Sequence, residues 1–160
     1  MGTEILVIFT VQIFFGYVYT LIGIIVTVFL AGLFPGALLG ERLRSRGRAL
    51  LSVTDGLLIL LLGGYILAVH HGGGALPVGL FLVFGFAVAL CCGFQFPVAL
   101  HVRGGSNRAV AGTFSADLIG AALGTMVTSV AGIPLTGLIW TAAGLIGLKT
   151  LSLTALWIKT

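Results

Sequence analysis

The sequence predicts an all-α integral membrane protein, a single bundle of about six transmembrane helices formed by residues 1–160. Hydrophobic residues make up 59% of the chain and charged residues 8%, and the mean hydropathy is +1.23. Soluble domains are about half apolar and about a quarter charged. Because one crossing needs about 20 apolar residues, this length accommodates roughly six spans joined by short loops. We therefore expect one transmembrane domain and no separate soluble domain.

The order of apolar stretches gives the expected spans. Residues 5–40 contain no charge, which is too long for one span, and residues 16–20 interrupt the stretch. We expect a short first helix and a second helix joined by a tight turn, with tyrosines at the membrane–water interface. The remaining spans are expected at about residues 50–69, 76–100 and 109–131, and from 135 toward 157.

Basic residues gather in alternate connections of the chain. The loops at 41–48 and 101–108 are rich in arginine, whereas the turns near 16–20, 70–75 and 132–134 contain none. The positive-inside rule then places both loops and both termini in the cytoplasm. Lys149 fits if the sixth helix ends early or if its side chain extends to the headgroups, and the sequence leaves both outcomes open. The residues that set this topology are Arg42, Arg44, Arg46, Arg48, Arg103 and Arg108.

The position of the basic residues between the spans also indicates which partners the chain can bind. The isoelectric point near 9.6 is typical of nucleic-acid-binding proteins, but the basic residues lie between apolar spans and form no soluble basic face. We expect no nucleic-acid partner. The expected partners are membrane lipids and other protein subunits.

Small residues repeat at every fourth position in two of the expected helices, which places them on one helical face. Such stripes let helix backbones approach closely in lipid, where the hydrophobic effect contributes little to helix association. Glycine is also simply frequent in membrane helices, so part of the spacing arises by chance. The predicted packing residues are Gly32, Gly36 and Gly40 in the second helix, and Gly112, Ala116, Gly120 and Gly124 in the fifth.

Asp117 is the most unusual polar residue inside an expected span. It follows Arg108 by nine residues, which places it about 12 Å into the span expected from residue 109. A carboxylate at the centre of a membrane helix costs about 2.5–3.5 kcal/mol on insertion scales, so we expect it to face protein. Its candidate partners are Thr113, Gln95 and Gln12. One interpretation is a proton or solute site; the favoured one is a hydrogen-bonded clamp, because no second intramembrane carboxylate is evident.

Other polar residues are expected to be structural. The histidines could hold a haem only if two of them met, but His70 and His71 are expected at the opposite membrane face from His101. Asp55 is expected to pair with an arginine of the preceding loop. The adjacent Cys91 and Cys92 are unsuited to a mutual disulfide and are expected to serve packing. We expect no cofactor and no metal site.

Several motifs resemble the membrane region of the bacterial spermidine synthase-like family, which joins a transporter-like region to an aminopropyltransferase-like domain. The resemblance covers most of the chain, and its motifs lie at residues 12–19, 29–36, 93–97 and 116–124. The segment 40–48 is more loosely similar to the loop between the second and third helices of major-facilitator transporters. These likenesses imply a six-helix half-bundle in a bacterial inner membrane.

The chain also departs from that family. The full-length relatives carry a Rossmann-type domain, and no Gly-x-Gly-x-x-Gly motif follows a strand-like segment here. Aminopropyl transfer is therefore not expected of this chain. The favoured hypothesis is a non-catalytic membrane subunit that anchors or organises a larger complex, such as a redox or synthase assembly. The alternative is a half-transporter that dimerises around Asp117 and Gln95 to move a small cationic or polyamine-like solute.

Overall fold

The computed structural model describes residues 1–16, 19–43, 47–72, 76–102, 104 and 107–158, with the side chains of residues 48, 109 and 155–158 excepted. These residues are almost entirely helical, and no strand occurs among them. Helices satisfy every backbone polar group within one segment, which is the requirement that lipid imposes. The elements are α1 (Gly2–Phe15), α2 (Tyr19–Leu43), α3 (Gly47–Gly72), α4 (Val78–Val102), α5 (Asn107–Met126), the π-helix η3 (Val127–Thr136) and α6 (Gly137–Ile158).

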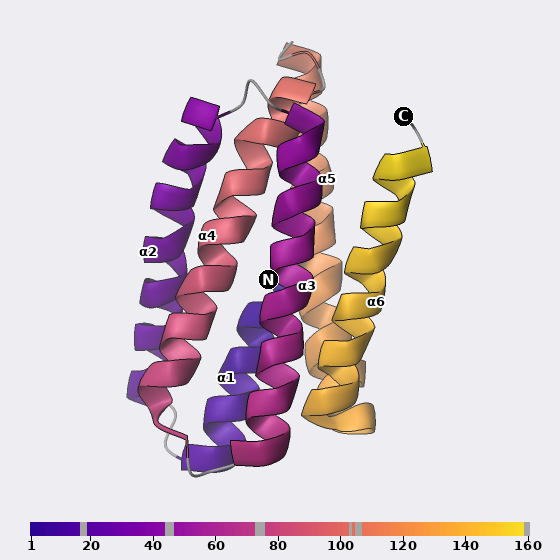
Figure 1. Ribbon diagram of the computed structural model, residues 1–160. Helices are drawn as coiled ribbons and strands as arrows, with labels where there is room; N and C mark the ends of the chain where they lie inside the picture. The colour runs from indigo at the N-terminus through magenta and orange to yellow at the C-terminus, as the bar shows by residue number, and fades with distance from the viewer. Residues whose placement is uncertain (17–18, 44–46, 73–75, 103, 105–106, 159–160) are drawn as a thin grey trace.

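Four helical stretches are long and apolar enough to cross a membrane, as expected of an integral membrane protein. They are Tyr19–Leu43, Ala49–Gly72, Val78–Val102 and Val110–Thr154. The last stretch reverses direction at Gly137, where φ is +81°, so that α5 with η3 and α6 run as two opposed legs (Figure 1). A side chain rarely adopts that backbone conformation, which glycine tolerates.

Helix α1 is too short to cross a membrane alone. Its 14 residues extend about 21 Å, short of the roughly 30 Å hydrocarbon core. It ends at Gly16, whose φ of +70° caps the helix while its N–H donates to the Gln12 carbonyl oxygen. In Figure 1, α1 lies beside only part of the length of α3. The helix is short, as expected, and the full count of six spans is not confirmed.

The closest helix pair is α2 with α4, and it is built on the α2 glycines. Gly32, Gly36 and Gly40 are all buried. A Cβ at Gly32 would lie 2.6 Å from the Phe86 carbonyl oxygen, and at the other two glycines it would come closer still to an α4 carbonyl. Gly93 of α4 meets the α2 backbone in the same way. The fourfold spacing therefore corresponds to a backbone-to-backbone seam.

Helix α1 fills the interior at the other end of the bundle. Its side chains Leu6, Val7 and Val11 are at most 1% exposed and pack in one cluster with Tyr65 of α3 and Phe81 of α4. The Tyr65 hydroxyl forms a hydrogen bond with Thr10. Because the Thr10 hydroxyl donates to the Leu6 carbonyl oxygen at 2.6 Å, it accepts from Tyr65. This bond ties α1 to α3 inside the core.

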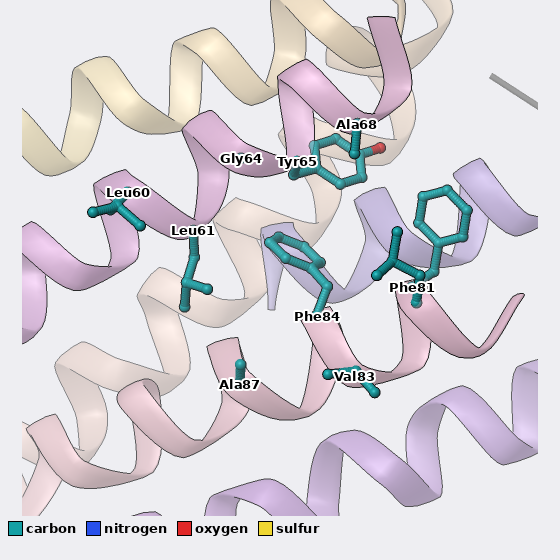
Figure 2. A pocket seen from close by; sticks show the side chains of 10 residues that line it. Leu60, Leu61, Gly64, Tyr65, Ala68, Phe81, Val83, Phe84 and Ala87 are labelled. Atoms are coloured by element: carbon teal, nitrogen blue, oxygen red, sulfur yellow. The ribbon is translucent and has the colours of Figure 1, made fainter. Parts of the chain in front are cut away.

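An apolar crevice lies between α3 and α4. It has a volume of about 260 Å³ and is lined by Leu60, Leu61, Gly64, Tyr65, Ala68, Leu80, Phe81, Val83, Phe84 and Ala87. Figure 2 shows these side chains, with the rings of Tyr65 and Phe84 facing one another; their centroids are 5.0 Å apart in a stacked arrangement. The one hydroxyl in this lining is bonded to Thr10. The crevice therefore offers little to a polar solute.

Candidate functional site

Three polar side chains from three helices meet inside the bundle. Lys149 of α6 donates to Asp55 Oδ1 of α3 at 2.8 Å and to Gln95 Oε1 of α4 at 3.1 Å. Gln95 Nε2 in turn donates to Asp55 Oδ1 at 2.7 Å. We call Asp55, Gln95 and Lys149 the polar triad. Each member is hydrogen-bonded to both others, so Gln95 bridges the two partners of the Lys149–Asp55 ion pair.

The members of the polar triad lie at one depth. Asp55 is eight residues from the start of α3, Gln95 seven from the end of α4 and Lys149 nine from the end of α6. At 1.5 Å per residue these offsets are about 10–14 Å from the helix ends. Those ends lie together at the top of Figure 1. The helices therefore bring three polar groups, distant in sequence, to one level within the apolar spans.

Burial differs sharply between the two charged members. The Asp55 side chain is 5% exposed and the Lys149 side chain 29%. A buried carboxylate must be paired to be tolerated, whereas a long ammonium side chain can extend toward water. The pair therefore consists of a fixed anion and a cation that has room to move.

Two of these positions correct the sequence-based expectation. Asp55 was expected to anchor a loop, but it is buried and faces Lys149 and Gln95. Neither outcome foreseen for Lys149 occurs, because α6 continues to Ile158 and the side chain turns inward to Asp55. The premise that no second carboxylate lies within the spans is also wrong. Among the loop arginines, 44 and 46 lie outside the described residues.

Two cavities border the polar triad. The larger, of about 640 Å³, is lined by Gln95 and Lys149 together with Thr113 and Asp117 of α5. The smaller, of about 360 Å³, is lined by all three triad members and by Ser152. Both cavities share Ala99 of α4 as well. The triad thus stands between two open spaces, and Lys149 borders each of them.

Asp117 lies across the larger cavity from the triad and is exposed. Among the described residues, neither a hydrogen bond nor an ion pair engages its carboxylate. Of its three expected partners, Gln95 and Thr113 line the same cavity, but Gln95 is bonded to Asp55 and Lys149. Gln12 is exposed and lines neither cavity near Asp117. The expected clamp between Asp117 and Gln95 is therefore not formed.

The small-residue stripe of α5 also differs from the expectation. A Cβ at Gly112 or Gly120 would meet nothing within 4 Å, and Ala116 is exposed. Gly124 alone approaches another helix, with the Gly2 nitrogen 3.7 Å from such a Cβ. The face packs against no other described helix of this chain along most of its length, because α5 lies at the edge of the bundle.

The remaining predicted residues lie at the helix ends. Arg42 and Arg108 are exposed, at the end of α2 and the start of α5, while 103 lies outside the described residues, as does the side chain of 48. His70 and His71 end α3, with ring centroids 5.0 Å apart, and His101 ends α4 at the opposite end of the bundle (Figure 1). Among the described residues, no group of three or more His, Cys, Asp and Glu side chains has a metal-binding arrangement.

No family model, curated protein or solved structure matches this chain. The resemblance to the spermidine synthase-like family therefore stays a prediction, and function is argued from the site itself.

Sequence reasoning missed the polar triad although one signal was present. Asp55, Gln95 and Lys149 each lie seven to nine residues from the helix terminus at the same end of the bundle. Ionisable residues within membrane spans are expensive unless they pair with one another. Equal depth combined with opposite charge could therefore have indicated that Lys149 and Asp55 meet.

Proposed function

We propose that this chain is a half-transporter-like bundle that moves a small cationic solute across a bacterial cytoplasmic membrane. The observation that carries the proposal is the polar triad, which lies within apolar spans between two cavities. Ionisable residues inside a membrane mark solute and ion pathways when they face a cavity. The favoured sequence-based hypothesis, a purely anchoring subunit, assumed that no site is assembled.

The charges of the site favour a cation. The charged side chains among the described lining residues are Asp55, Asp117 and Lys149, which sum to one negative charge when all are ionised. Lys149 neutralises Asp55, to which it is bonded. Among these side chains, Asp117 then carries the uncompensated negative charge, which favours a cationic solute beside it. Met1 also lines the larger cavity, so the N-terminal ammonium adds positive charge to that space.

The wider arrangement forms part of the same proposal. We take the chain to cross the membrane with α5 and α6 as separate spans, and with the arginine-bearing ends and the C-terminus in the cytoplasm. The N-terminus, expected there too, begins within the bundle, where Met1 lines the larger cavity. Its resemblance to the membrane region of the spermidine synthase-like family supports a transporter-like half-bundle. No aminopropyltransferase activity is proposed for it.

Uptake into proteoliposomes tests the carrier proposal. Wild-type protein is expected to take up labelled methylammonium or a polyamine above empty vesicles, and Asp117→Asn is expected to reduce uptake at least tenfold. The matched control is Ser115→Ala, on the same helix but outside both cavity linings. Wild-type vesicles that take up neither polyamines nor other small cations would overturn the proposal.

The α5 face supports a second candidate, a subunit of a larger membrane complex. Its small residues Gly112, Ala116 and Gly120 are exposed. Ile119 and Leu123, which lie beside this stripe, are exposed by 61% and 56%. Small-residue stripes in lipid favour close helix approach, and here another chain would have to supply the facing helix.

Co-purification from native membranes in mild detergent tests this candidate. Gly120→Leu is expected to release a partner chain, or a second copy of this chain, that wild-type protein retains. The control Gly56→Leu lies on α3, where added atoms also meet open space. Wild-type protein that elutes as a lone monomer under these conditions contradicts the candidate.

A further inference from the structure

Two oxygens, Asp55 Oδ1 and Gln95 Oε1, bind the ammonium group of Lys149. We call this pair of oxygens the receptor. Asp55 Oδ1 and Gln95 Oε1 lie 2.8 Å and 3.1 Å from the same Nζ atom. The Gln95 amide is held in this orientation, because its Nε2 donates to Asp55. A carboxylate and an amide oxygen that converge on one nitrogen match the donors of a primary ammonium. Both oxygens belong to helices other than that of the lysine, since Asp55 lies on α3 and Gln95 on α4.

Lys149 is also placed to leave that receptor. Its side chain is 29% exposed, against 5% for Asp55, and it lines both cavities. On the side of the larger cavity lies Asp117, a second carboxylate that no described residue pairs. A lysine that turned toward Asp117 would exchange one anionic partner for another. The free receptor at Asp55 and Gln95 would then need a new cation.

We propose that Lys149 is a tethered occupant of a primary-ammonium site formed by Asp55 and Gln95, and that a solute ammonium replaces it while Lys149 turns toward Asp117. The inference rests on the proposed carrier function and names the substrate class of that site. It gives a role to two carboxylates and one lysine: among these three side chains one carboxylate lacks a cationic side-chain partner, and a single solute ammonium supplies it. The solute class is an alkylammonium with at least two N–H donors on one nitrogen.

Chemical rescue tests the receptor without any transport assay. Lys149→Ala removes the propylammonium portion of the side chain and leaves Asp55 buried without its cation. n-Propylammonium chloride is expected to raise the thermal unfolding temperature of this variant in detergent by about 3–6 °C at tenfold excess over its dissociation constant. Tetramethylammonium, which has no N–H donor, and potassium, at the same ionic strength, are expected to give no comparable rise.

Two further variants complete the test. In Asp55→Asn/Lys149→Ala the anionic half of the receptor is absent, so propylammonium is expected to lose its advantage over potassium. If Lys149→Ala does not yield folded protein, Lys149→Gln replaces it, and the same order of the three cations is expected with smaller shifts. Equal effects of all three cations, or no shift in either single variant, overturn the inference.

The outcome is separable from that of the carrier proposal. If propylammonium stabilises the Lys149 variant but the wild-type protein shows no uptake, the ammonium-site proposal is supported and the carrier proposal is rejected. If wild-type protein takes up a cation but propylammonium does not stabilise the Lys149 variants, the carrier proposal is supported and the ammonium-site proposal is rejected. Each result therefore decides one proposal.

Discussion

The Lys149 ammonium lies 2.8 Å from the Asp55 carboxylate, although 94 residues separate them in the sequence. The contact joins α6 to α3, and Gln95 extends it to α4. Helices in lipid gain little from the hydrophobic effect between them, so a charge-assisted polar cluster contributes to their association. The same cluster that makes the candidate site thus also fixes where α6 lies.

The unequal burial of the pair predicts unequal costs of removing either charge. Lys149→Ala leaves a 5%-exposed carboxylate without its cation; because loss of a fully buried partner costs about 3–5 kcal/mol and this lysine is partly exposed, we expect about 2–3 kcal/mol. Asp55→Asn keeps the Gln95 contact and frees a lysine that can extend toward water, so we expect about 1 kcal/mol. Unfolding of both single variants and the double variant in detergent measures the difference.

The control for this prediction is the double variant itself. Asp55→Asn/Lys149→Ala leaves no uncompensated charge, so it is expected to be more stable than Lys149→Ala alone. Equal destabilisation by the two single variants would contradict the argument from unequal burial. A double variant whose loss of stability equals the sum of the two single losses would show that the ion pair is not coupled.

A second prediction concerns the seam between α2 and α4. Gly36→Ala places a Cβ against the backbone of Leu90, which cannot move aside as a flexible side chain can. Overpacking of this kind costs about 1–3 kcal/mol, and we expect the upper part of that range. Thermal unfolding of the purified variant measures the loss.

Gly23→Ala is the matched control for the seam. It lies on the same helix, and an added Cβ there meets nothing within 4 Å. Alanine also has the higher helix propensity, so the unfolding temperature should be unchanged or slightly higher. Equal losses at the two positions would mean that glycine content, and not backbone approach, matters.

These cases show what the sequence could predict and what it could not. The fourfold repeat of Gly32, Gly36 and Gly40 predicted a packing face, and the structure places a helix there. The same pattern at Gly112 and Gly120 faces open space, because periodicity defines a face without saying what lies opposite. Likewise the sequence marks Asp117 and Lys149 as costly in lipid, and equal depth makes Asp55 a candidate partner of Lys149. Only the arrangement of α3 against α6 decides between Asp55 and Asp117. Apolar content and loop charges are local properties; partners across the bundle are not.

The hydrogen bond between Tyr65 and Thr10 gives a third prediction. Tyr65→Phe removes the hydroxyl that donates to Thr10 and keeps the ring that stacks on Phe84. Interhelical hydrogen bonds in membrane proteins contribute about 0.6 kcal/mol on average and about 1.7 at most, so we expect a loss near 1 kcal/mol. Unfolding in detergent measures it, with Tyr19→Phe as the control because Tyr19 is 97% exposed. A loss for Tyr19→Phe as large as that for Tyr65→Phe would contradict the assignment.

A fourth prediction tests the proposed orientation in the membrane. Arg42 is in the last turn of α2 and Arg108 in the first turn of α5, and Figure 1 places these two helix ends at the same end of the bundle. The last turn of α3, which contains His71, lies at the other end. Single cysteines at these positions, in a background with Cys91→Ala and Cys92→Ala, can be labelled with a membrane-impermeant maleimide.

The expected labelling pattern follows from the positive-inside rule. In intact cells Cys at position 71 should be labelled, whereas Cys at 42 and at 108 should be labelled only after the membrane is opened. The comparison of 42 with 108 needs no assumption about which side is cytoplasmic, since α3 and α4 lie between them and return the chain to the side from which it left. Labelling of 42 and 108 from opposite sides would contradict two crossings by α3 and α4, and with them the common depth at which Asp55 and Gln95 meet.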